Sequence, residues 1–297
     1  MGKIFLNGEY IPKEEAKISV FDRGFLFGDG LFETMKAYKG IPLMLEKHLD
    51  RLFNGAEEMK IVIPYSRGEL SKIIYILLEI NQLKEAYLRL TVTRGVGKPG
   101  LDPKGCEHPT VLIVASQLTP YPEEAYVKGW EVSVVETLRN HPQALKPHIK
   151  SLNFLNNIFA RIEASEVGSF EGIMLNHSGY VTEGTVSNVF IVKNEQVITP
   201  SLELGLLPGI VREEVLELCI RNGIKSTEGK FTMTELEAAD ECFITNSLAE
   251  VLPVVKVNGN TINTGKPGLI TRQIAKLYKK TIDDYLRRFL DERTMDN

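Results

Sequence analysis

The sequence predicts an α+β fold with mainly antiparallel or mixed sheets. Short β-branched runs outnumber long amphipathic segments, and several runs are joined by hairpin-type turns such as Asn7-Gly8. No GxGxxG segment follows a predicted strand and no GxxxxGK[ST] segment occurs, so a parallel doubly wound sheet has no support. With 297 residues, the chain is long enough for two packed cores.

The first part of the chain reads as a small sheet that carries two helices. Alternating or β-branched runs bounded by Gly and Pro predict the strands, and apolar residues at helical spacing predict the helices. Ser66 and Glu69 stand at capping-box spacing before the second helix. The expected elements are a hairpin over 3–12, strands over 31–40, 86–95 and 110–118, and helices over 44–61 and 66–83.

A linker is expected at "TPYPEE", which starts at Thr119 and has two prolines between two strand-like runs. The predicted organisation is a small N-terminal domain over 1–118, an interdomain loop over 119–128 and a larger domain over 129–297. In the larger domain the expected strands are 130–136, 171–176, 181–193, 196–200, 241–247 and 251–259. The expected helices begin after Lys150, at Val211 with a Gly223 C-terminus, and over 269–290.

Composition excludes several classes of function. The net charge is −4 with both signs interspersed, so no nucleic-acid surface is expected. The longest apolar runs are too short to cross a bilayer, and the N-terminus lacks the apolar core of a signal peptide, so the protein is expected to be cytoplasmic. Three widely spaced cysteines form no disulfide framework, and the scattered histidines have no ligand spacing, so no metal site is expected.

Two isolated charged residues could carry chemistry. Lys150 lies in an extended segment just before a predicted helix, and Glu183 lies between β-branched runs in "YVTEGTVSNVF". A lysine in such a position is commonly a surface charge, and a carboxylate between strands is commonly solvated. The alternatives are an amine held where it can attack a carbonyl, and a buried acid that needs a partner.

Two turns could bind an anion. Pro208-Gly209 opens into a helix, so the amides of Ile210 and Val211 are helix-start donors. The strand "FIT" runs into a small polar turn at Asn246 and Ser247. Each turn has the simpler reading of a helix start or a loop. Together with the amine and the acid, they make the inventory that pyridoxal 5′-phosphate requires.

Five segments, in this order, give a family resemblance. They are "FDRGFLFGDGLFETMKAYKG", "IKSLNFLNNIFARIEA", "GYVTEGTVSNVFIV", "LLPGIVRE" and "FITNSLAEVLPV". The chain resembles the pyridoxal-phosphate fold-type IV family, the class IV aminotransferases, from about Phe5 to about Ile274. This family includes branched-chain aminotransferases, D-amino acid aminotransferases, 4-amino-4-deoxychorismate lyases and R-selective amine transaminases. The motifs are specific for the family and poorly specific for the member.

The resemblance implies roles for particular residues. Lys150 matches the lysine that forms a Schiff base with pyridoxal 5′-phosphate, and Glu183 matches the acid at the pyridine nitrogen. Arg51, in "HLDRL", matches the arginine that reaches the cofactor phosphate. Ile210 and Val211 match the amide donors after the Gly turn, although the family often has Thr where Val211 stands.

Further implications concern the second turn and the assembly. Asn246 and Ser247 match the second cofactor-binding turn, and Leu248 is expected to contact substrate. The family fold, that of D-amino acid aminotransferase, has two domains with the cofactor in the cleft between them. Family members are usually homodimers in which one subunit completes the other's site.

Substrate choice is the least determined property. Branched-chain enzymes commonly carry Tyr-x-Arg on a small-domain strand, and Tyr87 and Arg89 match it. An arginine there can bind the second carboxylate of glutamate or 2-oxoglutarate bidentately. The well-known D-amino acid enzymes have Arg-x-His in the following loop, which "GVGKPGLDP" lacks. Against the branched-chain type, Phe154 stands where those enzymes usually have a tyrosine.

The substrate pocket is expected to include Phe32, with Phe25 as a second candidate. Core packing is the alternative role for both aromatic residues.

The favoured interpretation is an aminotransferase that moves an amino group between an L-amino acid, expected to be branched-chain, and 2-oxoglutarate. The alternatives are 4-amino-4-deoxychorismate lyase, then a D-amino acid or R-amine transaminase. A non-catalytic binding protein is the alternative from another class, and the presence of both Lys150 and Glu183 argues against it.

Overall fold

A computed structural model describes residues 2–295, which divide into two compact units. Unit 1 consists of the chain as far as Thr119, the short segment Ile149–Phe154 and the chain from Asp284. Unit 2 consists of Pro120–His148 and Leu155–Asp283. No helix in the described part of the chain is long and apolar enough to cross a membrane.

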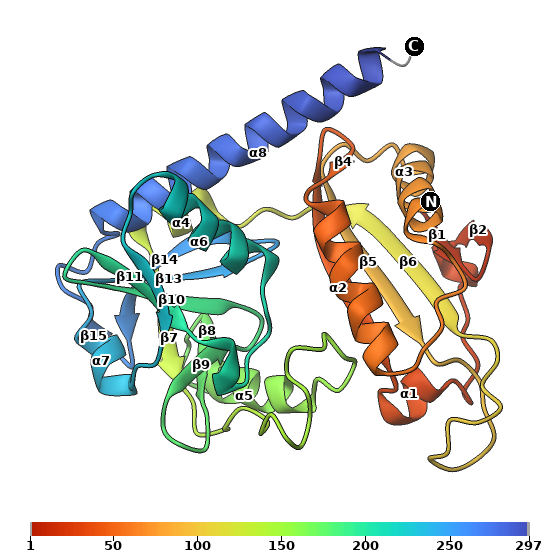
Figure 1. Cartoon of the computed structure of the whole chain (residues 1–297), viewed down its shortest axis with the longest axis horizontal. Helices are drawn as coiled ribbons and strands as arrows, with labels where there is room; N and C mark the ends of the chain where they lie inside the picture. Colours follow the sequence, from red (N-terminus) through yellow and green to blue (C-terminus); the bar gives the residue numbers. More distant parts are fainter. Residues whose placement is uncertain (1, 296–297) are drawn as a thin grey trace. The chain divides into compact units, whose positions relative to one another are not determined.

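Unit 1 is built on an antiparallel sheet with the strand order β2-β1-β6-β5-β3-β4 (Figure 1). Its central strands are long because alternating residues bury one face of the sheet. Its strands are β1 (Lys3–Leu6), β2 (Glu9–Pro12), β3 (Gly30–Tyr38), β4 (Ile41–Pro42), β5 (Ala86–Thr93) and β6 (Thr110–Gln117). Its helices are α1 (Arg23–Phe27), α2 (Leu45–Glu58) and α3 (Arg67–Ile80), with a short 3₁₀ turn at Lys13–Glu15.

The core of unit 1 lies between the sheet and the helices α2 and α3. On β5, Leu88, Leu90 and Val92 point to this face at every second position and are fully buried. They belong to one apolar cluster with Leu49 of α2 and Ile74 of α3. The opposite face of the same strands therefore lies away from the two helices, and it carries Tyr87 and Arg89.

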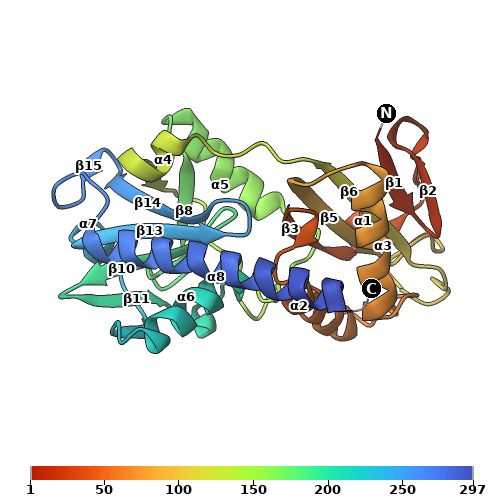
Figure 2. The same cartoon turned by 90° about the horizontal axis from the view of Figure 1, so that it is seen from above.

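Unit 2 is built on a nine-stranded mixed sheet. Eight strands follow the order β12-β11-β10-β13-β14-β7-β8-β9, and the ninth, β15, pairs with β14. Figure 2 labels β8, β10, β11, β13, β14 and β15 of this sheet. An additional pairing between β9 and β10 closes the strands from β10 round to β9 into a ring. The strands are β7 (Trp130–Val134), β8 (Glu171–Leu175), β9 (Val181–Gly184), β10 (Asn188–Lys193), β11 (Gln196–Pro200), β12 (Ser226–Gly229), β13 (Glu241–Asn246), β14 (Glu250–Val257) and β15 (Asn260–Thr261). The confirmed fold class is therefore α+β, with one antiparallel and one mixed sheet.

The helices of unit 2 start and end at identifiable signals. Glu241 of β13 accepts hydrogen bonds from the amides of Ile270 and Thr271, so a carboxylate caps the start of the terminal helix. A Cβ on Gly268 would lie 1.9 Å from a Glu241 side-chain atom, which requires glycine there. The helices are α4 (Glu123–Lys128), α5 (Leu155–Glu166), α6 (Ile210–Arg221), α7 (Met233–Glu237) and α8 (Leu269–Met295), with a 3₁₀ turn at Leu202–Leu204.

Most expected elements are present, and three differ in detail. The run over 181–193, expected as one strand, forms β9 and β10. The capping box of α3 forms as predicted, with Ser66 and Glu69 bonded reciprocally. Residues 123–128, expected to be part of a loop, form α4, because Pro122 starts a helical turn whose first residues are acidic. The C-cap of α6 is Asn222, and Gly223 follows it with a φ of 68°.

Candidate active site

Lys150 is held in unit 1 by backbone pairing with the start of β3. The amide of Phe32 donates to the Lys150 carbonyl at 2.9 Å, and the amide of Leu152 donates to the Gly30 carbonyl at 2.9 Å. An isolated antiparallel bridge joins Leu31 and Ser151 between these bonds. The backbone of Lys150 is therefore fixed as part of a sheet, and its side chain projects from a rigid support.

Three residues singled out in the sequence, Lys150, Arg89 and Phe154, lie against the ring of Phe32. The Lys150 Nζ lies 4.6 Å from the ring centroid, and the Arg89 guanidinium carbon lies 3.8 Å from it. The Phe154 ring packs edge-on at a centroid distance of 5.2 Å. Phe32 is 5% exposed, so the group combines an apolar aromatic surface with two cationic side chains.

Tyr87 lies on the same face of the sheet as Arg89. The two residues alternate along β5, and their cross-strand partners on β3 are Lys36 and Thr34. This face of the sheet combines the Phe32 ring with polar side chains, in contrast to the mainly apolar face that covers the core. Leu248, in unit 2, donates its amide to the Asn246 side chain.

Glu33 lies next to Phe32 in sequence and points to the opposite face of the sheet, towards α2. Its Oε1 accepts from Arg51 Nε at 2.8 Å, and its Oε2 accepts from Arg51 Nη2 at 2.7 Å and from His48 Nδ1 at 2.6 Å. Burial alone would raise the pKa of this carboxyl, but the Arg51 charge and its hydrogen bonds outweigh burial and lower the pKa from 4.5 to about 2. Glu33 is therefore ionised at neutral pH.

His48 is neutral in this cluster. Burial lowers the pKa of its imidazole, and the positive charges of Arg51 and Lys150 act in the same direction against the attraction of Glu33. Since Glu33 is an ionised acceptor, the hydrogen between them belongs to His48 Nδ1. The charge of Lys150, on one side of β3, therefore helps to lower the pKa of His48 on the other side.

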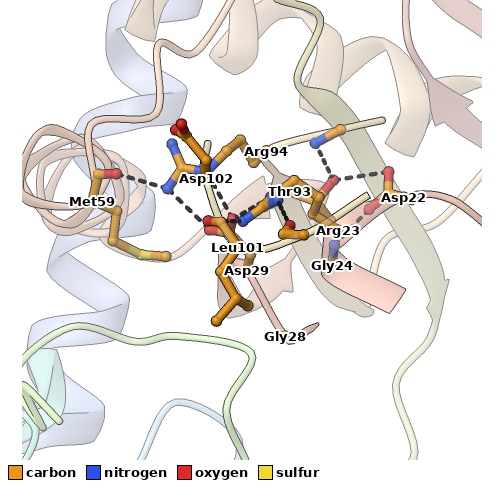
Figure 3. Close-up of polar contacts among 12 residues, drawn as sticks. Asp22, Arg23, Gly24, Gly28, Asp29, Met59, Thr93, Arg94, Leu101 and Asp102 are labelled. Carbon is orange, nitrogen blue, oxygen red and sulfur yellow. Dashed lines mark hydrogen bonds and ion pairs between the residues drawn. The ribbon is translucent and has the colours of Figure 1, made fainter. Parts of the chain in front are cut away.

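The C-terminal end of α2, the helix of His48 and Arg51, is anchored by a second charge network (Figure 3). Arg94 donates to the carbonyls of Met59 and Lys60 just beyond the helix and forms a bidentate pair with Asp29. Arg23 shares the same Asp29 carboxylate. Burial opposes ionisation of Asp29, but the two arginines outweigh it and lower the pKa of Asp29.

The same network holds the loop after β5, which contains the segment "GVGKPGLDP". Arg23, only 4% exposed, donates to the carbonyls of Gly100 and Leu101 at 2.9 and 3.0 Å. Asp22 caps the start of α1 through the Gly24 amide and accepts from the hydroxyl of Thr93. The loop is thereby fixed through its backbone carbonyls.

Glu183 is the centre of the candidate site in unit 2. It is 5% exposed and comes from β9. Its Oε1 accepts from Arg139 Nε at 2.7 Å, and its Oε2 accepts from the Leu207 amide at 3.0 Å. Arg139 is held in turn by Asn156, whose Oδ1 accepts from the guanidinium at 3.2 Å. The acid is therefore a buried, paired and oriented carboxylate.

A row of cross-strand partners in unit 2 runs from Glu183 to the turn at Asn246. Glu183 of β9 is the cross-strand partner of Asn188 of β10, which is the partner of Thr245 of β13. Neighbouring strands lie about 4.8 Å apart. Asn246 follows Thr245 directly, and its Oδ1 accepts from the amides of Leu248 and Ala249. This bonding shapes the turn that contains Ser247.

The loop into α6 is attached to the same row. Leu207 donates its amide to Glu183, and its carbonyl accepts from Asn188 Nδ2 at 2.9 Å. Gly209 is the N-cap of α6 and supplies no side-chain cap. A Cβ on Gly209 would lie 1.9 Å from Asn188 Oδ1, so glycine is required for this approach. The first amides of α6, at Ile210 and Val211, are therefore placed beside the row.

The residues of unit 2 fit a phosphorylated pyridine cofactor. Glu183 is a buried acid of the kind that pairs with a ring nitrogen, and α6 begins with amides that its N-cap does not satisfy. Among the described residues, the Thr245 hydroxyl is buried without a hydrogen-bond partner beside the Asn246 turn. Within residues 2–295, no group of three or more His, Cys, Asp or Glu side chains is arranged to hold a metal ion.

Sequence reasoning missed four polar residues that support the predicted ones: Glu33, His48, Arg139 and Asn188. Glu33 had the same signal as Glu183, an acid inside an apolar strand-like run, and His48 stands three residues before Arg51 on one helix face. Arg139 lies in a loop, where no periodicity points to a partner. Only the folded sheet brings it to Glu183.

Comparison with known families and proteins identifies the family of this chain. The family model for amino-transferase class IV matches residues 30–257. A protein of Methanocaldococcus jannaschii, provisionally named a branched-chain-amino-acid aminotransferase, is 41% identical over 93% of this chain and 95% of its own length. Aminodeoxychorismate lyase of Bacillus subtilis is 34% identical over 95% of this chain and 96% of its own length. D-alanine aminotransferase of Bacillus licheniformis is 35% identical over 94% of this chain and 97% of its own length.

Solved structures give the same result. The branched-chain aminotransferase of Thermoproteus uzoniensis, solved with norvaline, has a TM-score of 0.88 and 33% identity, with 94% of each chain covered. A second branched-chain amino acid aminotransferase, solved with pyridoxamine 5′-phosphate, has a TM-score of 0.90 and 28% identity, covering 94% of this chain and 93% of that one. The chain thus has the fold-type IV fold, and it belongs to the class IV aminotransferases, which depend on pyridoxal phosphate.

Proposed function

We propose that the protein transfers an amino group between a branched-chain L-amino acid and 2-oxoglutarate. The observation that carries the proposal is the Arg89 guanidinium stacked on the Phe32 ring beside Lys150. A branched aliphatic side chain needs an apolar surface, which the Phe32 ring together with the less buried Phe154 ring packed edge-on against it would supply. A dicarboxylate needs a cation for its second carboxylate, which the guanidinium supplies. One group of residues can therefore serve both substrates.

The proposed chemistry divides between the two sets of residues. Bound pyridoxal 5′-phosphate would supply the aldehyde that takes up the amino group and the ring that accepts electrons when the α-proton leaves. Lys150 Nζ would hold the cofactor covalently and then move the α-proton. Glu183, kept oriented by Arg139 and the Leu207 amide, would hold the ring nitrogen protonated. Arg51, the Ile210 and Val211 amides, Asn246 and Ser247 would bind the phosphate side.

The substrate assay distinguishes the proposed function from its rivals. Incubation of the protein with L-leucine and 2-oxoglutarate should produce glutamate, whereas a lyase would release pyruvate from aminodeoxychorismate and need no amino acceptor. Because one relative is a D-alanine aminotransferase, the third substrate pair in the assay is D-alanine with 2-oxoglutarate. Glutamate formed only from D-alanine, or pyruvate formed only from aminodeoxychorismate, would contradict the proposal. The same assay with R-amines tests the remaining alternative.

The lyase is the second candidate because of Phe154. This residue packs on Phe32 and has no hydroxyl, in contrast to the tyrosine that the resemblance leads one to expect in a branched-chain enzyme. The lyase relative is 34% identical, close to the identity of the D-alanine enzyme. If glutamate forms from L-leucine at a rate comparable with other family substrates, the missing hydroxyl is not decisive for the reaction.

We further propose that the active form is a homodimer. On α5, the large apolar side chains Leu155, Ile158, Phe159 and Ile162 are each at least 49% exposed and repeat at i, i+3, i+4 and i+7. Such a stripe on a helix is typical of an interface. Light scattering of the purified protein should give about twice the chain mass of 33.4 kDa. A monomer mass at assay concentration would contradict the proposal.

A further inference from the structure

The cluster of Glu33, His48 and Arg51 has no assigned role apart from the phosphate contact expected of Arg51. We propose that Glu33 and His48 are positioning residues that fix the guanidinium of Arg51 for binding the cofactor phosphate. The proposal rests on the role proposed for Arg51 and adds what holds that side chain in place. It concerns only residues of unit 1.

The geometry of the Arg51–Glu33 pair fixes the plane of the guanidinium. Both oxygens of Glu33 are engaged, one by Nε at 2.8 Å and the other by Nη2 at 2.7 Å. A bidentate contact of this kind leaves the planar group no free rotation. Glu33 engages two of the five N–H groups of Arg51. The Arg51 side chain is 13% exposed, whereas that of Glu33 is 0% exposed.

His48 fixes the carboxylate that fixes the arginine. It comes from the same helix three residues earlier, so it shares the helix face of Arg51. Its Nδ1–H donates to Glu33 Oε2 at 2.6 Å, and its side chain is 3% exposed. Glu33 therefore has two partners on one rigid helix. The carboxylate has no other orientation that keeps both of them.

The charges show that orientation, and not attraction, is the contribution of Glu33. Glu33 carries one negative charge that offsets the positive charge of Arg51, and His48 is neutral. A phosphate approaching this cluster gains less Coulomb attraction than it would from an isolated arginine. An arginine already held in one geometry, however, loses little side-chain entropy when the phosphate binds.

The test compares two probes that differ only in the phosphate, pyridoxal 5′-phosphate and pyridoxal. Dissociation constants for both are measured by equilibrium dialysis on the full chain. The ratio of the pyridoxal constant to the pyridoxal 5′-phosphate constant reports the phosphate contribution alone. In Glu33→Gln the ratio should fall by roughly 10-fold, the size of one lost charge-assisted hydrogen bond. The control Asp50→Asn removes the same charge from the neighbouring residue of α2, which is 60% exposed and pairs with Arg67, and should keep the wild-type ratio.

The His48 variants keep the test independent of any folding defect in Glu33→Gln. Asparagine can place an N–H close to where His48 Nδ1–H lies, and leucine cannot. In His48→Asn the ratio of dissociation constants should therefore stay close to the wild-type ratio. In His48→Leu this ratio should fall several-fold further than in His48→Asn. Equal ratios in the two variants, each measured on protein shown to be folded by circular dichroism, would overturn the role of His48.

Two outcomes separate this proposal from the function on which it rests. If Arg51→Gln leaves the ratio unchanged, Arg51 does not bind the phosphate, and the role proposed for it fails together with this inference. If Arg51→Gln lowers the ratio and Glu33→Gln does not, Arg51 binds the phosphate without help, and only the positioning role is refuted. A higher ratio in Glu33→Gln would also refute it, because Glu33 would then compete with the phosphate for Arg51.

Discussion

Replacement of Lys150 by alanine is expected to abolish amino transfer and the covalent retention of the cofactor. Loss of a positioned proton-transfer group alone slows a reaction by roughly 10²–10⁴-fold. Loss of the covalent bond to the cofactor aldehyde adds to this. The other cation that lies against the Phe32 ring is Arg89, and a guanidinium that stays protonated cannot take over the role of the amine.

The structure indicates that this loss would be chemical and not structural. The contacts that hold the segment to β3 are made by the backbone of Lys150 and Leu152, and alanine keeps them. The side chain of Lys150 is only partly buried, so its removal leaves no core cavity. Lys150→Ala should therefore unfold at close to the wild-type temperature while its turnover is lost.

Borohydride reduction followed by peptide mapping measures the covalent bond directly. In the wild-type protein the mass of the reduced cofactor should be found on Lys150, and in Lys150→Ala it should be absent. Lys146→Ala is the matched control, since Lys146 is exposed and lies four residues earlier in the sequence. Cofactor mass on another lysine in the wild-type protein would refute the catalytic assignment.

The second large effect is expected for Glu183→Gln. Glutamine has the shape of glutamate, but it carries no charge to hold the ring nitrogen protonated. We expect the cofactor to stay bound through Lys150 while kcat falls by roughly 10²–10³-fold, as for other removed electrostatic contacts in buried sites. The replacement also leaves the Arg139 guanidinium, 2.7 Å from Glu183 in the native protein, without its carboxylate partner.

Glu171→Gln provides the matched control for Glu183→Gln. Glu171 is another buried carboxylate of the same sheet, 2% exposed, and it accepts from the Gly172 and Thr185 amides and the Ser187 hydroxyl. These partners are uncharged, so the control should lose stability but keep kcat per folded molecule. Stopped-flow measurement of the first half-reaction with L-leucine isolates the step. Full activity in Glu183→Gln would refute the role of Glu183.

Local patterns were sufficient to predict most secondary structure. The alternation of β5, the helical spacing of α2 and the capping box of α3 are properties of neighbouring residues, and each is present in the structure. The short elements α1, α4, α7, β4, β12 and β15 were not foreseen. In so few residues periodicity is weak, and tertiary contacts decide which conformation forms.

The candidate site shows the same division. The sequence by itself determined the family, and it predicted the amine at Lys150 and the acid at Glu183, because these stand within motifs of adjacent residues. Only the tertiary structure decided that Glu33 and His48 bind one another and Arg51, and that Arg139 binds Glu183. The partners of these two carboxylates lie between 15 and 44 positions away in the chain. Buried charges need partners wherever the fold supplies them, and sequence distance carries no record of that choice.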